Sequence, residues 1–163
     1  MTNLSVVDHN EILLELAFTH NISGNVLFPE GKILDQLKEI DGNQAAVKLT
    51  ANISEHELNV HYKIETIILP DLEQNTPGFR IGICTLGAFS IGGSVNKIKK
   101  ENFAKHDAIN LICGVGRESF ASMARTLGIY PVAVEYGALP PLQYTKRAVK
   151  KMLDRGQIEI HWV

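Results

Sequence analysis

Apolar and polar residues alternate with a period of two in four stretches of the chain, which is the pattern of strands with one buried face. These stretches cover residues 12–22, 47–54, 58–68 and 79–91. Short links join the last three, so we expect those strands to form an antiparallel meander. Gly87 interrupts the last stretch, which indicates a bulge or a close backbone approach.

The first stretch is less regular than the others, because its opening residues would also suit a helix. As a strand it would place five apolar residues on one face: Ile12, Leu14, Leu16, Phe18 and Ile22. Residues 24–44, which follow, are too many for a hairpin. We expect a crossover there that contains a short amphipathic piece.

The second half of the chain changes to helical spacing. Apolar residues recur every three or four positions from Ala108 onwards, and Gly128 and Pro131 predict where that helix ends. A second helix is predicted over residues 143–155, and residues 157–163 alternate again. No linker divides residues 1–163, so we expect one α+β domain with a mostly antiparallel sheet.

Composition agrees with a single globular domain. The chain has 163 residues, of which 45% are hydrophobic and 21% charged, and this excludes intrinsic disorder. Its net charge of −2 is too balanced to predict a nucleic-acid partner. Two cysteines, Cys84 and Cys113, are too few for a disulfide framework and suggest reduced thiols. The first ten residues do not read as a signal peptide, and no apolar stretch reaches about 20 residues, so we expect a cytoplasmic protein without membrane insertion.

One motif invites a phosphate-binding interpretation. Residues 113–119 read CGVGRES, and glycines let backbone N–H groups approach a pyrophosphate at a helix N-terminus. Serine replaces the third glycine, however, and the flanking strand–helix–strand pattern is absent. We therefore favour a helix start, or a helix face on which small residues permit close packing.

Other candidate chemistry is sparse. His56 and His61 would point to opposite faces, no metal-ligand spacing occurs, and we expect no metal or cofactor. Ser119 lacks the strained turn of a nucleophile, and Cys113 reads as a small core residue. Four lysines within residues 97–105 are diluted by acids, which favours a solvated connection over a nucleic-acid patch. The residues assemble no catalytic constellation, and we expect no enzyme.

Several short motifs, in order, resemble the SecB family of protein-export chaperones. Residues 87–93 (GAFSIGG) resemble the end of its fourth strand, and residues 110–123 contain the Asn, aliphatic pair, Arg-Glu and Ser-Met of its first helix. Residues 128–131 and 139–142 are similar to its Gly-x-Phe-Pro and its proline-containing loop. The collinear resemblance spans residues 12–153. Weaker matches to its first two strands lie at residues 18–23 and 47–49.

The resemblance implies a fold and an assembly. The fold would be a four-stranded antiparallel sheet with a crossover between strands one and two, and two C-terminal helices on one side. Gly114 stands where the family has proline, so the regular part of the first helix would begin near Gly116. The assembly would be a homotetramer, a dimer of dimers with the first helices between the dimers. The interface positions on that helix would be Ile109, Ile112, Phe120 and Met123.

The implied activity is that of an ATP-independent holdase, which binds unfolded or precursor polypeptides in apolar grooves to keep them soluble for export or handover. Such a groove gains about 25 cal/mol per Å² of buried apolar area, whatever the client sequence. The matching groove positions are Val26, Leu27, Phe28, Ile33, Leu34, Leu37, Val47, Leu49, Tyr144, Val149, Met152 and Leu153. All of them could instead be core. For the strand residues the two interpretations are equally supported, whereas Phe28 and the crossover residues favour the groove.

Some residues depart from the family pattern. Export chaperones use acidic residues on the sheet and an acidic tail to dock on the SecA motor. Here the matching sheet positions are Asn21, Asn25 and Gly82, and the chain ends in a strand-like segment, which puts that contact in doubt. One alternative is a SecB-like chaperone dedicated to one partner, such as an antitoxin. Another is a small ligand-binding or enzymatic α+β domain.

Overall fold

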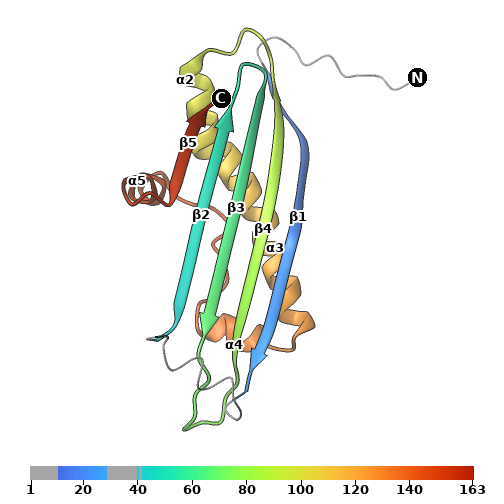
Figure 1. Cartoon of the computed structure of the whole chain (residues 1–163), viewed down its shortest axis with the longest axis vertical. Helices are drawn as coiled ribbons and strands as arrows, with labels where there is room; N and C mark the ends of the chain where they lie inside the picture. Colours follow the sequence, from blue (N-terminus) through green and yellow to red (C-terminus); the bar gives the residue numbers. More distant parts are fainter. Residues whose placement is uncertain (1–10, 29–39, 41) are drawn as a thin grey trace, which may run out of the picture.

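A five-stranded mixed sheet forms the centre of the computed structural model, which describes residues 11–28, 40 and 42–163 (Figure 1). The strand order is β1-β4-β3-β2-β5. The strands are β1 (Ile12–Leu27), β2 (Gln44–Ile53), β3 (Glu57–Ile68), β4 (Gly78–Ile91) and β5 (Ile158–Trp162). The four predicted alternating stretches are all confirmed as strands, and β2, β3 and β4 form the expected antiparallel meander.

The fifth strand corrects the expected four-stranded antiparallel sheet. β5 pairs in parallel with the second half of β2, from Leu49 to Ile53. A turn at Gly156, where φ is +70°, reverses the chain after the last helix and delivers β5 to this edge. Ile158, opposite Leu49, is 3% exposed, so β5 covers apolar side chains that β2 would otherwise present to water.

Two bulges correct the predicted face of β1. Its register against β4 shifts between Leu14 and Leu16 and again between Thr19 and Asn21. A bulge moves the following side chains to the opposite face. Leu14 therefore lies opposite the inward Phe89 on the helix side of the sheet, whereas Leu16 lies opposite Ala88 on the other side, here called the outer face. The predicted amphipathic piece of the crossover lies outside the described residues.

Helices cover the inner face of the sheet, with α3 running along its length and α5 beside β5 at the sheet edge (Figure 1). The helical elements are α2 (Lys97–Phe103), the π-helical turn η1 (Ala104–Ala108), α3 (Ile109–Thr126), α4 (Tyr130–Glu135) and α5 (Lys146–Asp154). Both predicted helices are confirmed as α3 and α5. Gly128, with φ of +72°, follows α3 as expected, but Pro131 lies at the start of a further helix, α4.

The lysine-rich segment is helical, which corrects the expectation of a solvated connection. Lys100 is 8% exposed and its Nζ donates to the Glu55 carbonyl at 2.8 Å. Trp162 of β5 donates from Nε1 to Glu101 at 2.9 Å, and Lys97 lies 4.9 Å from the centre of the Trp162 ring. These contacts tie the end of β5 to α2.

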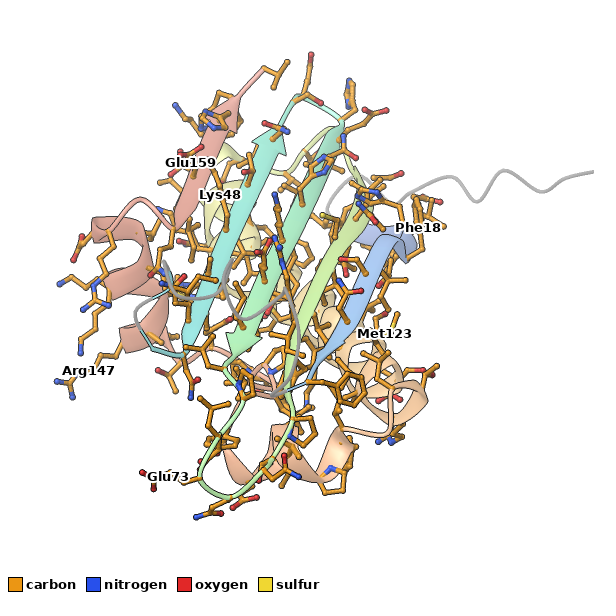
Figure 2. All side chains as sticks on the ribbon, turned by 60° about the horizontal axis from the view of Figure 1, so that its bottom comes forward. Phe18, Lys48, Glu73, Met123, Arg147 and Glu159 are labelled. Carbon is orange, nitrogen blue, oxygen red and sulfur yellow. The ribbon has the colours of Figure 1, made fainter. Side chains whose placement is uncertain are left out.

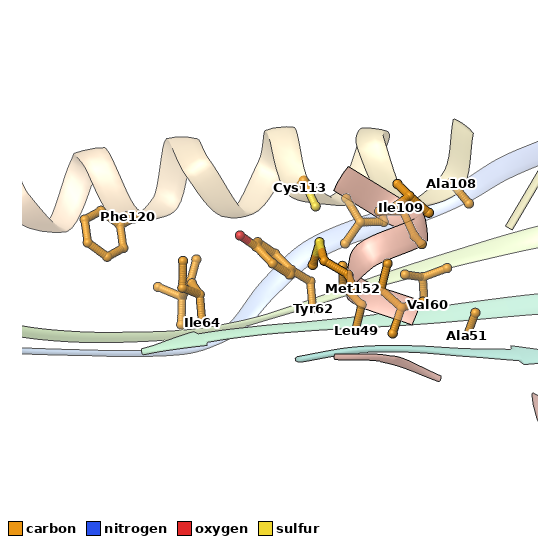
Figure 3. Packing of buried hydrophobic residues seen from close by; sticks show 14 of the residues in the cluster. Leu49, Ala51, Val60, Tyr62, Ile64, Ala108, Ile109, Cys113, Phe120 and Met152 are labelled. Carbon is orange, nitrogen blue, oxygen red and sulfur yellow. The ribbon is translucent and has the colours of Figure 1, made fainter. Parts of the chain in front are cut away.

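The core lies between α3 and the sheet, and glycines let the two approach closely (Figure 3). A Cβ added at Gly116 would lie 2.6 Å from two atoms of the buried Tyr62 ring, and one at Gly87 would lie 2.1 Å from Ile112. Helix α3 runs without interruption through Gly114 and Gly116, so the regular helix does not begin near Gly116 as expected. The 113–119 motif is thus a packing face within a helix, and the phosphate-loop interpretation is wrong.

The two helix glycines give a matched test of this packing. Gly114→Ala should raise the free energy of unfolding by about 0.5–1 kcal/mol, because alanine favours the helix and nothing lies within 4 Å of its new methyl group. Gly116→Ala should instead lower it by about 1–3 kcal/mol, because the methyl group would overlap the Tyr62 ring. Urea unfolding of both variants measures the difference, and equal stabilisation by both would contradict the close approach.

Candidate functional site

The predicted groove residues on β2 and α5 are brought together, but several of them lie in the core. Leu49 and Val149 are each 1% exposed and Met152 is 8% exposed. These residues belong to one buried cluster, which also contains Ile158 of β5. Val47 and Leu153 are half-buried, and Val47 lines a hollow of about 300 Å³ beside the edge of β2.

The other groove residues lie at the far end of β1. Leu27 is buried, Val26 is half-buried and Phe28 is 62% exposed. Strands β4 and β3 separate β1 from β2, which corresponds to about 14 Å between their axes. The described residues therefore form two apolar regions rather than one continuous groove. The remaining predicted positions, Ile33, Leu34 and Leu37, lie outside the described residues.

Tyr144 links the groove region to the core through a pair of hydroxyl groups. Its hydroxyl oxygen lies 3.5 Å from that of Tyr62. Tyr62 itself lies beneath α3 (Figure 3). Burial raises the pKa of both tyrosines, and it raises the pKa of the neighbouring Cys113 thiol to about 12. All three groups therefore stay protonated near neutral pH, and Cys113 occupies the core position expected from the sequence.

Polar residues of α3 hold the segment that leads into α5. The Asn110 side chain accepts from the Tyr144 backbone N–H at 2.8 Å and donates to the Tyr144 carbonyl at 3.4 Å. Arg117 donates to the Pro140 carbonyl. The Thr145 hydroxyl then accepts from the Ala148 N–H at 3.1 Å, which caps α5. Asn110 and Arg117 belong to the motif that resembles the SecB helix, but the sequence alone did not assign them this positioning role.

The predicted interface residues of α3 divide into two groups. Ile109, Ile112 and Phe120 are each 0% exposed and pack against the sheet within one chain, so they leave no surface for a second copy in this conformation. Met123 is half-buried at the β1 side of α3, where its side chain would lie 2.8 Å from a Cβ at Gly24. It therefore borders the free edge of the sheet.

That free edge carries several exposed apolar side chains, and sequence reasoning missed it. β1 has 16 residues and, among the described residues, pairs only with β4, so within them its other side carries unpaired backbone donors and acceptors. Four of its apolar side chains are 39–51% exposed: Leu14, Leu16, Phe18 and Ile22. Phe18 and Met123 both lie along this side of the molecule (Figure 2). Edge exposure could not be found from alternation alone, because alternation does not reveal which strand lies outermost.

Other candidate chemistry is absent from the part of the chain that the structure describes. No group of three or more His, Cys, Asp or Glu side chains there could hold a metal ion. The Ser119 hydroxyl lies 2.5 Å from that of Thr19, which is 3.0 Å from that of Thr85, so it joins α3 to the sheet. None of the described helices combines the length and apolar character needed to cross a membrane.

Comparisons with known proteins identify no family for this chain. No protein-family model and no curated protein matches the sequence. Among solved structures, the chain is similar to a protein of unknown function from Streptococcus agalactiae, at 12% identity and a TM-score of 0.43. That alignment covers 83% of this chain and 97% of the other.

Proposed function

We propose that this chain is a SecB-like chaperone, an ATP-independent holdase that binds unfolded or precursor polypeptides and keeps them soluble for export or handover. The observation that carries the proposal is that, within the described part of the chain, β1 has a long unpaired edge and exposed apolar side chains lie on and beyond it. The collinear motifs of residues 12–153 add the resemblance on which the name rests.

The physical basis is recognition without dependence on sequence. An extended polypeptide pairs with any free strand edge through its backbone, and apolar surface gains about 25 cal/mol per Å² on burial for every client. The chain offers both features on β1. It offers them again on β2, where the residues from Gln44 to Lys48, next to the half-buried Val47, have no partner among the described residues on the β5 side.

Two edges allow two kinds of contact. We assign the β1 edge, with Leu16 and Phe18 beside it and Met123 bordering it, to a second copy of the chain. Self-association would cover the longer edge, as native proteins must to avoid aggregation. Phe28 and the open half of β2 then remain for the client. The homotetramer that the resemblance implies would need a second contact besides this edge, because Ile109, Ile112 and Phe120 of the implied α3 interface are buried within one chain.

The assembly predicts a solution mass near four times the chain mass of 18.0 kDa. Leu16→Lys should weaken self-association at least tenfold, because it places a charge within the buried apolar contact. Val134→Lys on α4 is the control, since Val134 is 50% exposed and Leu16 51%. Sedimentation equilibrium of the three proteins checks this, and a wild-type monomer would contradict the assembly.

The holdase activity predicts that the purified protein suppresses aggregation of a chemically unfolded client without nucleotide. Phe28→Asp should reduce suppression severalfold, because it removes exposed apolar surface from the client region. Leu72→Asp should leave it unchanged, although Leu72 is 64% exposed and Phe28 62%. Light scattering during dilution from denaturant measures both. Absence of suppression by the wild-type protein, or equal losses in the two variants, would refute the assignment.

A further inference from the structure

Two lysines face each other on the outer face of the sheet. The β2–β3 register places Lys48 directly opposite Lys63, and the next row on this face pairs Thr50 with His61. Directly opposite side chains have Cβ atoms about 5 Å apart, and like charges at that distance destabilise a sheet. A local conflict of this kind is typical of a position that serves binding rather than folding.

The lysine pair also borders open space. Lys48 and Lys63 together line two hollows on the outer face, of about 240 and 300 Å³. His20 and His61 line the first hollow, and Glu65 lines the second. We call Lys48, Lys63, His20 and His61 the cationic sheet face. Figure 2 shows Lys48 on β2 beside Glu159 of β5.

Acidic residues of the same face do not neutralise Lys63. Glu159 lies 3.2 Å from the Lys48 Nζ, and the hydrogen bond from Lys48 lowers the pKa of that carboxyl group. The Glu65 carboxylate forms an ion pair with the Arg80 guanidinium, with 2.8 Å between Oε1 and Nη2. Within the described residues, Lys63 has no ion-pair partner. Its charge is therefore available to a ligand.

We propose that the cationic sheet face binds an acidic segment of a partner polypeptide, with Lys63 as its main contact. Rows of side chains on a strand repeat about every 6.6 Å, which matches the spacing of alternate residues in an extended peptide. Carboxylates of such a segment would bind Lys63 and the imidazole of His61 one row away. Leu86, opposite His61 on β4, extends this row with apolar surface.

The chemistry favours carboxylates over phosphates. Phosphate sites in proteins often draw on free backbone N–H groups, and the central strands β3 and β4 use theirs in the ladder over these rows. A nucleic acid would also meet a chain of net charge −2, which opposes a long polyanion. A short acidic peptide carries enough charge for two lysines without that repulsion.

Lys63, the main contact of this site, lies apart from the proposed client region. It is on the outer face of β3, whereas Phe28 lies at the end of β1, and Lys48 alone is shared with the open half of β2. Lys63→Glu therefore need not affect suppression of aggregation, and failure of the holdase proposal would leave the lysine site in place.

The test uses a fluorescent peptide of alternating glutamate and serine, with a peptide in which glutamine replaces glutamate as control. Fluorescence anisotropy should show binding of the acidic peptide that weakens with salt. Lys63→Glu should lower its affinity at least tenfold, and Lys150→Glu on α5 should change it less than twofold. Equal losses in the two variants, or equal binding of the glutamine peptide, would overturn the proposal. So would tighter binding of a single-stranded DNA of matched charge.

A stability measurement separates loss of the site from loss of the fold. Lys63→Glu replaces a repulsive cross-strand pair with an attractive one opposite Lys48, so its melting temperature should rise while peptide affinity falls. A lowered melting temperature would show that Lys63 serves the fold, and would overturn the proposal.

Discussion

The close approach of α3 to the sheet is the contact on which the rest of the fold depends. At Gly116 the helix backbone lies against the Tyr62 ring, and at Gly87 the sheet backbone lies against Ile112. A side chain at either position would push the two layers apart, and interiors packed at crystal-like density cannot absorb such a shift without loss. Glycine weakens the helix at Gly116, and burial of the aromatic ring offsets this cost.

The position of α3 in turn determines that of the C-terminal third. Asn110 and Arg117 fix the backbone at Tyr144 and Pro140, and Thr145 then caps α5. The turn after α5 delivers β5 to the free side of β2. A displacement of α3 would therefore reach β5 through a chain of directional hydrogen bonds, although the helix and this strand lie far apart in the sequence.

Much of the fold could be predicted because its signals are local. Strict alternation identifies β2, β3 and β4, and helical spacing with Gly128 and Gly156 identifies α3 and α5. The errors come from non-local pairing. Nothing in the sequence of β5 identifies β2 as its partner or indicates that the two strands are parallel. Alternation also cannot reveal the bulges that place Leu14 and Leu16 on opposite faces of the sheet. The site was harder to predict, because apolar residues such as Leu49 and Val149 fit a core and a groove equally well. Only their burial in the folded chain shows that they belong to the core.

Within the described residues, helices cover the sheet on one side only, and the sheet presents two chemically different surfaces. In this part of the chain the β1 edge combines unpaired backbone with exposed apolar side chains, whereas the outer face carries the charge of Lys63, which has no ion-pair partner there. Burial of apolar area responds weakly to salt, but exposed charges are screened over about 8 Å at physiological ionic strength. Partners of the two surfaces would therefore respond differently to salt. Because Lys63 lies on the central strand β3 and the free backbone of β1 lies on an edge strand, one partner can occupy its surface without removing the backbone groups that the other requires.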